Sequence, residues 1–220
     1  MKANLTITTI RICALIAITS VSACSVFGVN GVEEAMYEVS EQHDDIEIRD
    51  YAPMVVVETV VDEGFEEAGS TGFRRLFKYI SGNNSGDTRI DMTAPVIQDP
   101  VQSPAGRKID MTAPVIRESA GAGWRTQFVL PADITYESAP QPLDDQVAVV
   151  QIPPRQTAVI RFSGEWSMES MQQKTLRLQG WIEDNGWQAV SEPRWAGYDP
   201  PWTLPMMRRN EVLIDIQRKQ

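Results

Sequence analysis

The stretch GFRRLFKYISGNN, residues 72–84, predicts a helix and the point at which that helix ends. Acidic residues precede it and basic residues lie within it, an order that suits the helix dipole. The Gly- and Asn-rich segment 81–87, SGNNSGD, then stops the helix. Positions on one helical face recur at steps of three and four residues: Phe65, Gly69, Gly72, Phe73, Leu76, Phe77 and Ile80.

Strands are predicted on both sides of this helix. Residues 36–41 and 45–51 alternate apolar and polar side chains, and residues 54–61, MVVVETVV, are rich in β-branched residues. Another strand is predicted at 124–131, WRTQFVLP. The proline-rich segment 137–145 that follows is the best candidate for a boundary between two halves of the chain.

The second half repeats this order of elements. A strand is predicted at 156–164, and a helix follows Ser167, which suits an N-cap. The helical positions are Met168, Met171, Thr175, Leu178 and Ile182, and Asn185-Gly186 ends the helix. Strands at 187–198 and 210–217 complete a second strand–helix–strand–strand unit. Two such units predict an α+β fold in which helices cover antiparallel sheets.

The seven residues Ile-Asp-Met-Thr-Ala-Pro-Val occur twice between the two units, at 90–96 and 109–115. Each copy has the pattern of a strand that leads into a proline. Because proline cannot donate to a sheet ladder, each copy marks an edge or a bend.

The first 23 residues predict a signal peptide, with an apolar run too short for a comfortable transmembrane helix. They end in Val21-Ser22-Ala23-Cys24, which resembles the bacterial lipobox, where the cysteine is lipidated and becomes the new N-terminus. The alternatives are an ordinary secretory signal with a chance cysteine, or a retained anchor. We therefore predict lipidation of Cys24, a tether over 24–35 and one folded domain over 36–220.

Lipidation predicts an anchored protein in the bacterial cell envelope, facing the periplasm. Ser25 favours the outer membrane, because the aspartate that retains some lipoproteins in the inner membrane is missing at this position. Cleavage also removes Cys13 and leaves Cys24 as the only cysteine, so no disulfide, thiolate metal site or cysteine nucleophile is expected. The formal charge of −10 argues against nucleic-acid partners, which require a basic surface.

Four stretches resemble the SOUL heme-binding protein family, and together they span nearly the whole mature chain. They are YEVSEQHDDIEIRDYAP at 37–53, GFRRLFKYISGNN at 72–84, the two copies of IDMTAPV, and RRNEVLIDI at 208–216. The resemblance implies a distorted antiparallel β-barrel of two sheets flanked by two long helices, in agreement with the duplicated unit. It also implies binding of heme, porphyrin or another hydrophobic small molecule.

The doubled phrase is common among bacterial and plant members of the family. The resemblance therefore favours two turns of one hairpin-like region over two active sites, with Met and Val of each copy packed in the barrel. Asp91 and Asp110 are interpreted as a solvated strand face rather than an acid/base pair.

One branch of the family ligates heme iron through a histidine in its opening motif. The matching stretch here is IEIRDYAP, 46–53, and Asp50 stands at the ligand position, where a carboxylate is a poor replacement for imidazole. His43, the only histidine, is predicted to be a surface residue in a turn. Met92 and Met111 could ligate iron through sulfur, but core packing is the favoured interpretation.

Another branch holds a tetrapyrrole without an iron–histidine bond, against an apolar patch on the first helix. By this resemblance Phe73 and Phe77 would contact the ring, and Arg75 and Lys78 would meet its propionates. With Asp50, these are the predicted ligand-binding residues. The alternative is that the two phenylalanines face the core and the two cations are solvated. Burying several hundred Å² of porphyrin surface would contribute roughly 5–10 kcal/mol before the costs of association.

The sequence lacks the common enzyme motifs, such as Gly-x-Ser-x-Gly, paired metal-binding histidines or a phosphate-binding glycine loop. We therefore predict a lipid-anchored envelope protein that binds heme, porphyrin or a similar hydrophobic small molecule and is not an enzyme. The main alternative is a structural or protein-interaction lipoprotein that has lost tetrapyrrole binding. The weakest hypothesis is an enzyme acting on a planar ligand.

Overall fold

The computed structural model describes residues 32–86, 106–200 and 202–219. The predicted signal peptide, Cys24 and the first copy of the doubled phrase, with Asp91 and Met92, lie outside these residues. The elements are β1 (Tyr37–His43), β2 (Ile46–Tyr51), β3 (Met54–Val61), α1 (Phe65–Ile80), β4 (Asn84–Ser85), β5 (Val115–Ala120), β6 (Gly123–Val129), β7 (Gln141–Pro142), β8 (Ala148–Ile152), β9 (Arg155–Phe162), α2 (Met168–Asp184), β10 (Trp187–Ala189), β11 (Arg194–Gly197), the 3-10 helix η1 (Pro205–Met207) and β12 (Asn210–Arg218).

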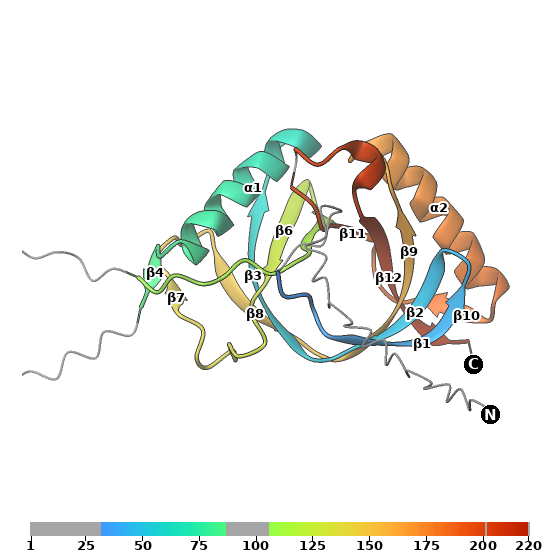
Figure 1. Ribbon diagram of the computed structural model, residues 1–220, viewed down its shortest axis with the longest axis horizontal. Helices are drawn as coiled ribbons and strands as arrows, with labels where there is room; N and C mark the ends of the chain where they lie inside the picture. Colours follow the sequence, from blue (N-terminus) through green and yellow to red (C-terminus); the bar gives the residue numbers. More distant parts are fainter. Residues whose placement is uncertain (1–31, 87–105, 201, 220) are drawn as a thin grey trace, which may run out of the picture.

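One curved antiparallel sheet forms the body of the described chain. Its strand order is β1-β2-β9-β12-β11-β5-β6-β3-β8, and β10 pairs with β12 beside this path. The short strands β4 and β7 form a separate ribbon. Helix α1 packs on β3 and β6, and α2 packs on β9, β10 and β12, so both helices lie outside the curve of the sheet (Figure 1). The predicted α+β fold, a distorted barrel flanked by two helices, is confirmed.

The strand order also shows the predicted duplication. The half β8-β3-β6-β5 and the half β2-β9-β12-β11 have the same arrangement, and they join where β5 pairs with β11. The two halves are therefore parts of one continuous sheet. The outermost strand of each half comes from the other sequence unit: β8 of the second unit pairs with β3, and β2 of the first unit pairs with β9.

Apolar positions at the predicted spacing place the main core between the sheet and the two helices. Under α1, the core includes Leu76, Tyr79 and Ile80 from the helix and Val57 and Phe128 from the strands. The core under α2 draws on both units: Ile46, Ile48, Ala158, Ile160, Met171, Leu178, Ile182, Trp187, Trp195, Val212, Ile214 and Ile216. The predicted cap of α2 is also confirmed, since the Ser167 hydroxyl accepts a hydrogen bond from the Ser170 N–H.

Residues 33–35, at the end of the predicted tether, are part of the folded domain. The Ala113 N–H donates to the Glu33 carbonyl at 2.8 Å, and the Ala35 N–H donates to the Ala113 carbonyl at 3.3 Å. Arg209 also donates two hydrogen bonds of 3.0 Å to the Glu34 carboxylate. The domain therefore begins before Met36, the predicted boundary.

A buried ion pair connects the two units across the inner face of the sheet. Arg49 of β2 donates to both oxygens of Glu211 on β12, at 2.8 and 3.0 Å, and both side chains are almost fully buried. The Tyr198 hydroxyl and the Arg209 Nε also donate to Glu211, at 2.8 and 2.9 Å. Burial opposes ionisation of this carboxylate, but hydrogen bonds and charge from Arg49 and Arg209 hold the pKa of Glu211 below its ordinary value.

Replacing Glu211 by Gln should lower the free energy of unfolding at pH 7 by about 3–5 kcal/mol, because it leaves buried guanidinium groups without their carboxylate. Since the pKa of Glu211 is lowered on folding, its stabilisation is present above the ordinary glutamate pKa, about 4.3, and is lost as the pH falls through the lowered value. Urea unfolding at pH 7 and pH 3 measures both effects.

The difference in stability between the wild type and Glu211→Gln should therefore shrink at pH 3. The matched control is Glu192→Gln, which removes an exposed carboxylate and should change stability by no more than about 0.5 kcal/mol. An equal difference at both pH values would contradict the assigned role of the Glu211 charge.

Candidate functional site

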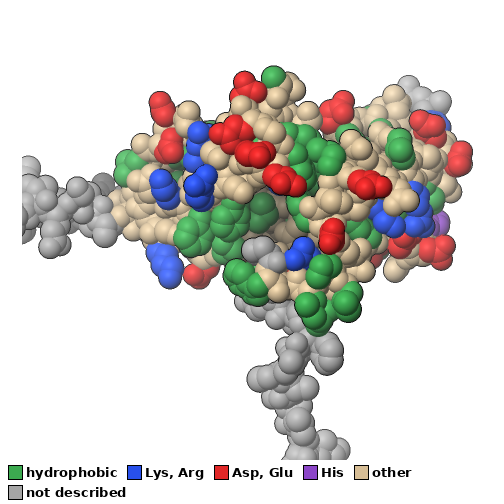
Figure 2. Space-filling model, turned by 90° about the horizontal axis from the view of Figure 1, so that it is seen from above, with side chains coloured by type: hydrophobic (Ala, Val, Ile, Leu, Met, Phe, Trp, Pro, Cys, Tyr) green, Lys and Arg blue, Asp and Glu red, His purple; other side chains and the backbone are tan. Residues whose placement is uncertain are grey.

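An exposed aromatic pair lies on one flank of α1. Phe73 and Phe77 are 38% and 47% exposed, and their rings stack with centroids 6.0 Å apart and planes 11° from parallel. Phe73 also meets the buried Phe128 ring of β6 edge-on, with centroids 5.2 Å apart. Viewed from above, hydrophobic side chains gather beside lysine and arginine side chains over the α1 half of the molecule (Figure 2). The aromatic pair is therefore a surface feature anchored on the core.

Close packing of α1 on the sheet positions this pair. A Cβ atom at Gly72 would lie 2.6 Å from Thr126 Oγ1 and 2.9 Å from Thr126 Cβ, so glycine permits the approach of α1 to β6. On the same face Leu76 and Tyr79 are almost completely buried. The Tyr79 hydroxyl donates to the Pro140 carbonyl at 2.8 Å, and burial raises its pKa to about 12.

The Asn84 side chain holds the segment after α1 in place through three hydrogen bonds. Its side-chain amide donates to the Tyr79 carbonyl at 2.7 Å and to the Arg107 carbonyl at 2.8 Å, and its Oδ1 accepts from the Arg107 N–H at 2.9 Å. The Ile109 N–H then donates to the Ile80 carbonyl at 2.7 Å. The turn thus holds the end of α1 against the start of the second copy of the doubled phrase.

That second copy is structural at the positions that the structure describes. Ile109 belongs to the core under α1, and Met111 and Val115 pack against the same cluster. Ala113 belongs to the core of the inner face, and Asp110 is exposed. The packing interpretation is therefore confirmed for this copy. The predicted strand before the proline is wrong, because β5 begins at Val115, after Pro114.

The two predicted cations of α1 lie on different sides of the helix. Lys78 is exposed next to Phe77, and its ammonium has no ion-pair partner among the described residues. Arg75 instead turns toward β3, where it donates to Thr59 Oγ1 at 3.3 Å and to the Val60 carbonyl at 3.4 Å. Successive helical residues are separated by roughly 100°, so Arg75 points about 200° away from Phe73.

Arg74 is the basic residue that the sequence reasoning missed. It is exposed, follows Phe73 directly, and lies one turn before Lys78. Among the described residues its guanidinium donates to Ser70 and Thr71 of the same helix, at 3.3 and 3.4 Å. A helical wheel favours Arg74 over Arg75 as a neighbour of the aromatic pair, because Arg74 follows Phe73 by one residue just as Lys78 follows Phe77.

Asp50 and His43 lie on strands at the other end of the sheet. Asp50 is exposed on β2 and accepts a hydrogen bond of 2.8 Å from Gln156. His43 ends β1, with an exposed ring whose centroid lies 5.2 Å from that of Trp181 on α2. The surface position predicted for His43 is confirmed, but the residue belongs to β1 and not to the turn that follows it. The structure does not bring either residue to the aromatic pair on α1.

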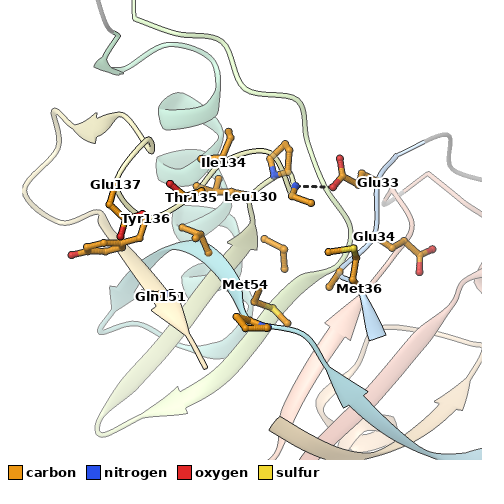
Figure 3. Close-up of a pocket in the computed structure, with 16 residues that line it drawn as sticks. Glu33, Glu34, Met36, Met54, Leu130, Ile134, Thr135, Tyr136, Glu137 and Gln151 are labelled. Atoms are coloured by element: carbon orange, nitrogen blue, oxygen red, sulfur yellow. Dashed lines mark hydrogen bonds between the residues drawn. The ribbon is translucent and has the colours of Figure 1, made fainter. Parts of the chain in front are cut away.

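A separate pocket of about 310 Å³ lies where β3 begins and β6 ends. Its lining comes from residues 33–36, 53–55, 129–132 and 134–137, together with Gln151 of β8 (Figure 3). In the close-up, Glu33 lies on the opposite side of the pocket from Tyr136 and Glu137. Sequence reasoning missed these residues because they come from segments that the fold brings together from distant parts of the chain.

Comparison with known proteins assigns the fold and the sequence to a family. The model of the SOUL heme-binding protein family matches residues 32–105 and 101–215. The chain belongs to the SOUL heme-binding protein family. It is 28% identical to human "Heme-binding protein 2" and 27% identical to its mouse counterpart, over 192 residues and 85% of each chain.

A solved structure shows the same fold without close sequence similarity. The crystal structure of the EcmrR C-terminal domain matches with a TM-score of 0.53 and 12% identity, covering 83% of this chain and 99% of that domain. At this identity the likeness concerns the fold alone.

The residues of this SOUL domain fit a porphyrin held by ring contact better than one held by histidine ligation. The only histidine lies at the α2 half, whereas the stacked phenyl pair and its two neighbouring cations lie on α1. The described residues also contain no group of three or more His, Cys, Asp or Glu side chains able to hold a metal ion. Within the same residues, none of the helices is long and apolar enough to cross a membrane.

Two glycine-to-alanine substitutions should distinguish the effect of α1 packing on stability from the effect of helix propensity. Gly180→Ala on α2 adds a methyl group with no atom within 4 Å and should stabilise the domain by about 0.5–1 kcal/mol. Gly72→Ala should destabilise it by about 1–3 kcal/mol, because its methyl group would clash with Thr126. Urea unfolding of both variants tests this contrast. A stabilising Gly72→Ala would show that α1 does not need this close approach.

Proposed function

We propose that this protein binds heme, porphyrin or a similarly planar hydrophobic molecule against Phe73 and Phe77 of α1, without catalysing a reaction. The observation that carries the proposal is the exposed, nearly parallel stack of these two rings. A large aromatic surface left open on a helix is characteristic of a binding site rather than of a folding core. Membership of a heme-binding family supports the same ligand class.

The neighbouring charges suit a planar ligand that carries carboxylates. Arg74 and Lys78 follow Phe73 and Phe77 in sequence, so one cation stands beside each ring on the solvent side of the helix. In this proposal the phenyl rings cover part of one ligand face, and the cations meet its carboxylates at the edge. Exposed ion pairs contribute only about 0.2–1 kcal/mol each, so most of the affinity comes from apolar contact.

The proposal also includes a lipid anchor at Cys24 and a location in the bacterial envelope, on the outer membrane and facing the periplasm. The support is the lipobox-like sequence Val21-Ser22-Ala23-Cys24, followed by a family match that begins at residue 32. An anchored domain of this kind would hold or hand on a hydrophobic ligand close to the membrane. The net charge of −10 supports the proposal that nucleic acid is not its partner.

A hemin titration followed by the Soret band tests the binding face. Phe77→Asp should lower hemin affinity at least about tenfold, because burial of one large apolar side chain contributes about 1.5–3 kcal/mol. The matched control is Leu176→Asp, which makes the same kind of change at a 70% exposed residue of α2 and should leave affinity unchanged. Equal losses in the two variants would refute the α1 face as the binding surface.

Charge variants in the same titration distinguish the two flanks of α1. Lys78→Gln should weaken hemin binding by about twofold to fivefold, as expected for an exposed ion pair. Arg75→Gln and His43→Ala should leave it unchanged, because their side chains lie away from the aromatic pair. No saturable Soret shift in the wild type would favour a structural or protein-interaction role instead.

Lipid anchoring is tested by Cys24→Ser in a bacterial host that processes lipoproteins. The wild-type protein should fractionate with membranes and incorporate labelled fatty acid, because several acyl chains together give stable anchoring. The variant should do neither. Membrane association that persists in Cys24→Ser, without acylation, would support a retained signal anchor.

A further inference from the structure

We propose that the pocket where β3 begins and β6 ends binds a small organic cation, namely an ammonium group that carries an apolar body. Its volume of about 310 Å³ lies at the lower end of the range for small-molecule sites, about 300 to 1,000 Å³. The inference is independent of the hemin proposal, since neither Phe73 nor Phe77 lines this pocket.

The interior of the pocket suits the apolar body of such a ligand. Met36, Met54, Leu130 and Ile134 contribute aliphatic and thioether side chains from three segments of the chain (Figure 3). Methionine side chains adapt to ligands of different shape, and Met36 is 60% exposed at this site. Contact with these side chains would remove apolar ligand surface from water.

Every charged residue among the described lining residues is acidic. They are Glu33, Glu34 and Glu137. Glu34 is paired with Arg209, which donates to both of its carboxylate oxygens at 3.0 Å. Glu33 accepts a hydrogen bond of 2.7 Å from the Ala132 N–H, and no lysine or arginine of the described residues pairs with Glu33 or Glu137. The pocket therefore carries uncompensated negative charge, which is complementary to a cation.

An aromatic side chain completes this arrangement. Tyr136 is 47% exposed and lies across the pocket from Glu33 (Figure 3). An ammonium group can be attracted both by a carboxylate and by the face of a tyrosine ring. A ligand between these two sides could use Glu33 for charge pairing and Tyr136 for a cation–π contact.

Other ligand classes fit the pocket less well. An anion would meet like charges on both sides, and a neutral apolar molecule would leave the carboxylates unused. A bare metal ion prefers several oxygen ligands at short range, whereas the described residues hold no cluster of three or more acidic, His or Cys side chains for one. The combination of an aliphatic interior and unpaired carboxylates thus selects an amphipathic cation.

Benzyltrimethylammonium is a suitable probe, with benzyl alcohol and benzoate as neutral and anionic counterparts. Each would be titrated into the ¹⁵N-labelled full chain and followed by amide NMR shifts. We expect saturable shifts at residues 33–36 and 129–137 with the cation, weakening as salt is raised. Benzyl alcohol and benzoate should bind at least tenfold more weakly. Equal affinity for benzyl alcohol, or saturable shifts confined to other residues, would overturn the proposal.

Two pairs of variants test the residues. Glu33→Gln keeps a side-chain oxygen to accept the Ala132 N–H but removes the charge, and it should lower affinity for the cation about fivefold. The remote Glu192→Gln should leave affinity unchanged. Met36→Lys should abolish binding by placing a cation at the pocket, whereas the neutral Met36→Gln should retain most of it. Wild-type affinity in both Glu33→Gln and Met36→Lys would assign the binding to another site.

Discussion

The ion pair between Arg49 and Glu211 joins parts of the chain that are 162 residues apart, and the interlocked sheet depends on it. Arg49 lies on β2, a strand of the first unit that pairs with β9 of the second unit. Its guanidinium reaches past β9 to the carboxylate on β12. Arg49 also donates to Glu47 of its own strand at 2.7 Å, but only the Glu211 carboxylate is fully buried. A buried charge is costly unless it is paired and hydrogen-bonded, so this pair favours the strand arrangement that brings Arg49 and Glu211 together. The pair therefore favours β2 as the strand that lies beside β9 at the outer side of the second half.

This ion pair also gives a structural role to two of the stretches that resemble the SOUL family, 37–53 and 208–216. Arg49 and Tyr51 belong to the opening motif, and Arg209 and Glu211 belong to the closing motif. In the structure Arg49 donates both to Tyr51 and to Glu211, and Arg209 also donates to Glu211. Two distant sequence signatures thus form one polar network on the inner face of the sheet.

Local patterns predicted local structure well, because spacing and caps act within a few residues. The strand at 54–61 and the helix beginning at Phe65 and ending at Ile80 have the predicted bounds, and Ser167 caps α2 as expected. Strand β8 was missed, since its five residues are exposed or only partly buried and Pro153 and Pro154 follow it directly. The predicted strand 187–198 is interrupted because Pro193 lacks an N–H for a ladder and lies between β10 and β11. Joining of the halves and assembly of the pocket depend on long-range pairing that periodicity does not encode.

The duplicated scaffold is nearly symmetric in its strand order, but its two helices carry different surfaces. Leu76 and Ile80 of α1 and Leu178 and Ile182 of α2 are buried at the same four-residue spacing, so these two pairs correspond. At the positions where α1 carries Phe73 and Phe77, α2 therefore carries Thr175 and Gln179. A threonine and a glutamine offer little flat apolar surface to a planar ring, whereas two stacked phenyl groups do. The two helices thus hold equivalent places in the fold, and the stacked phenyl groups of α1 support the proposal that a planar ligand binds there.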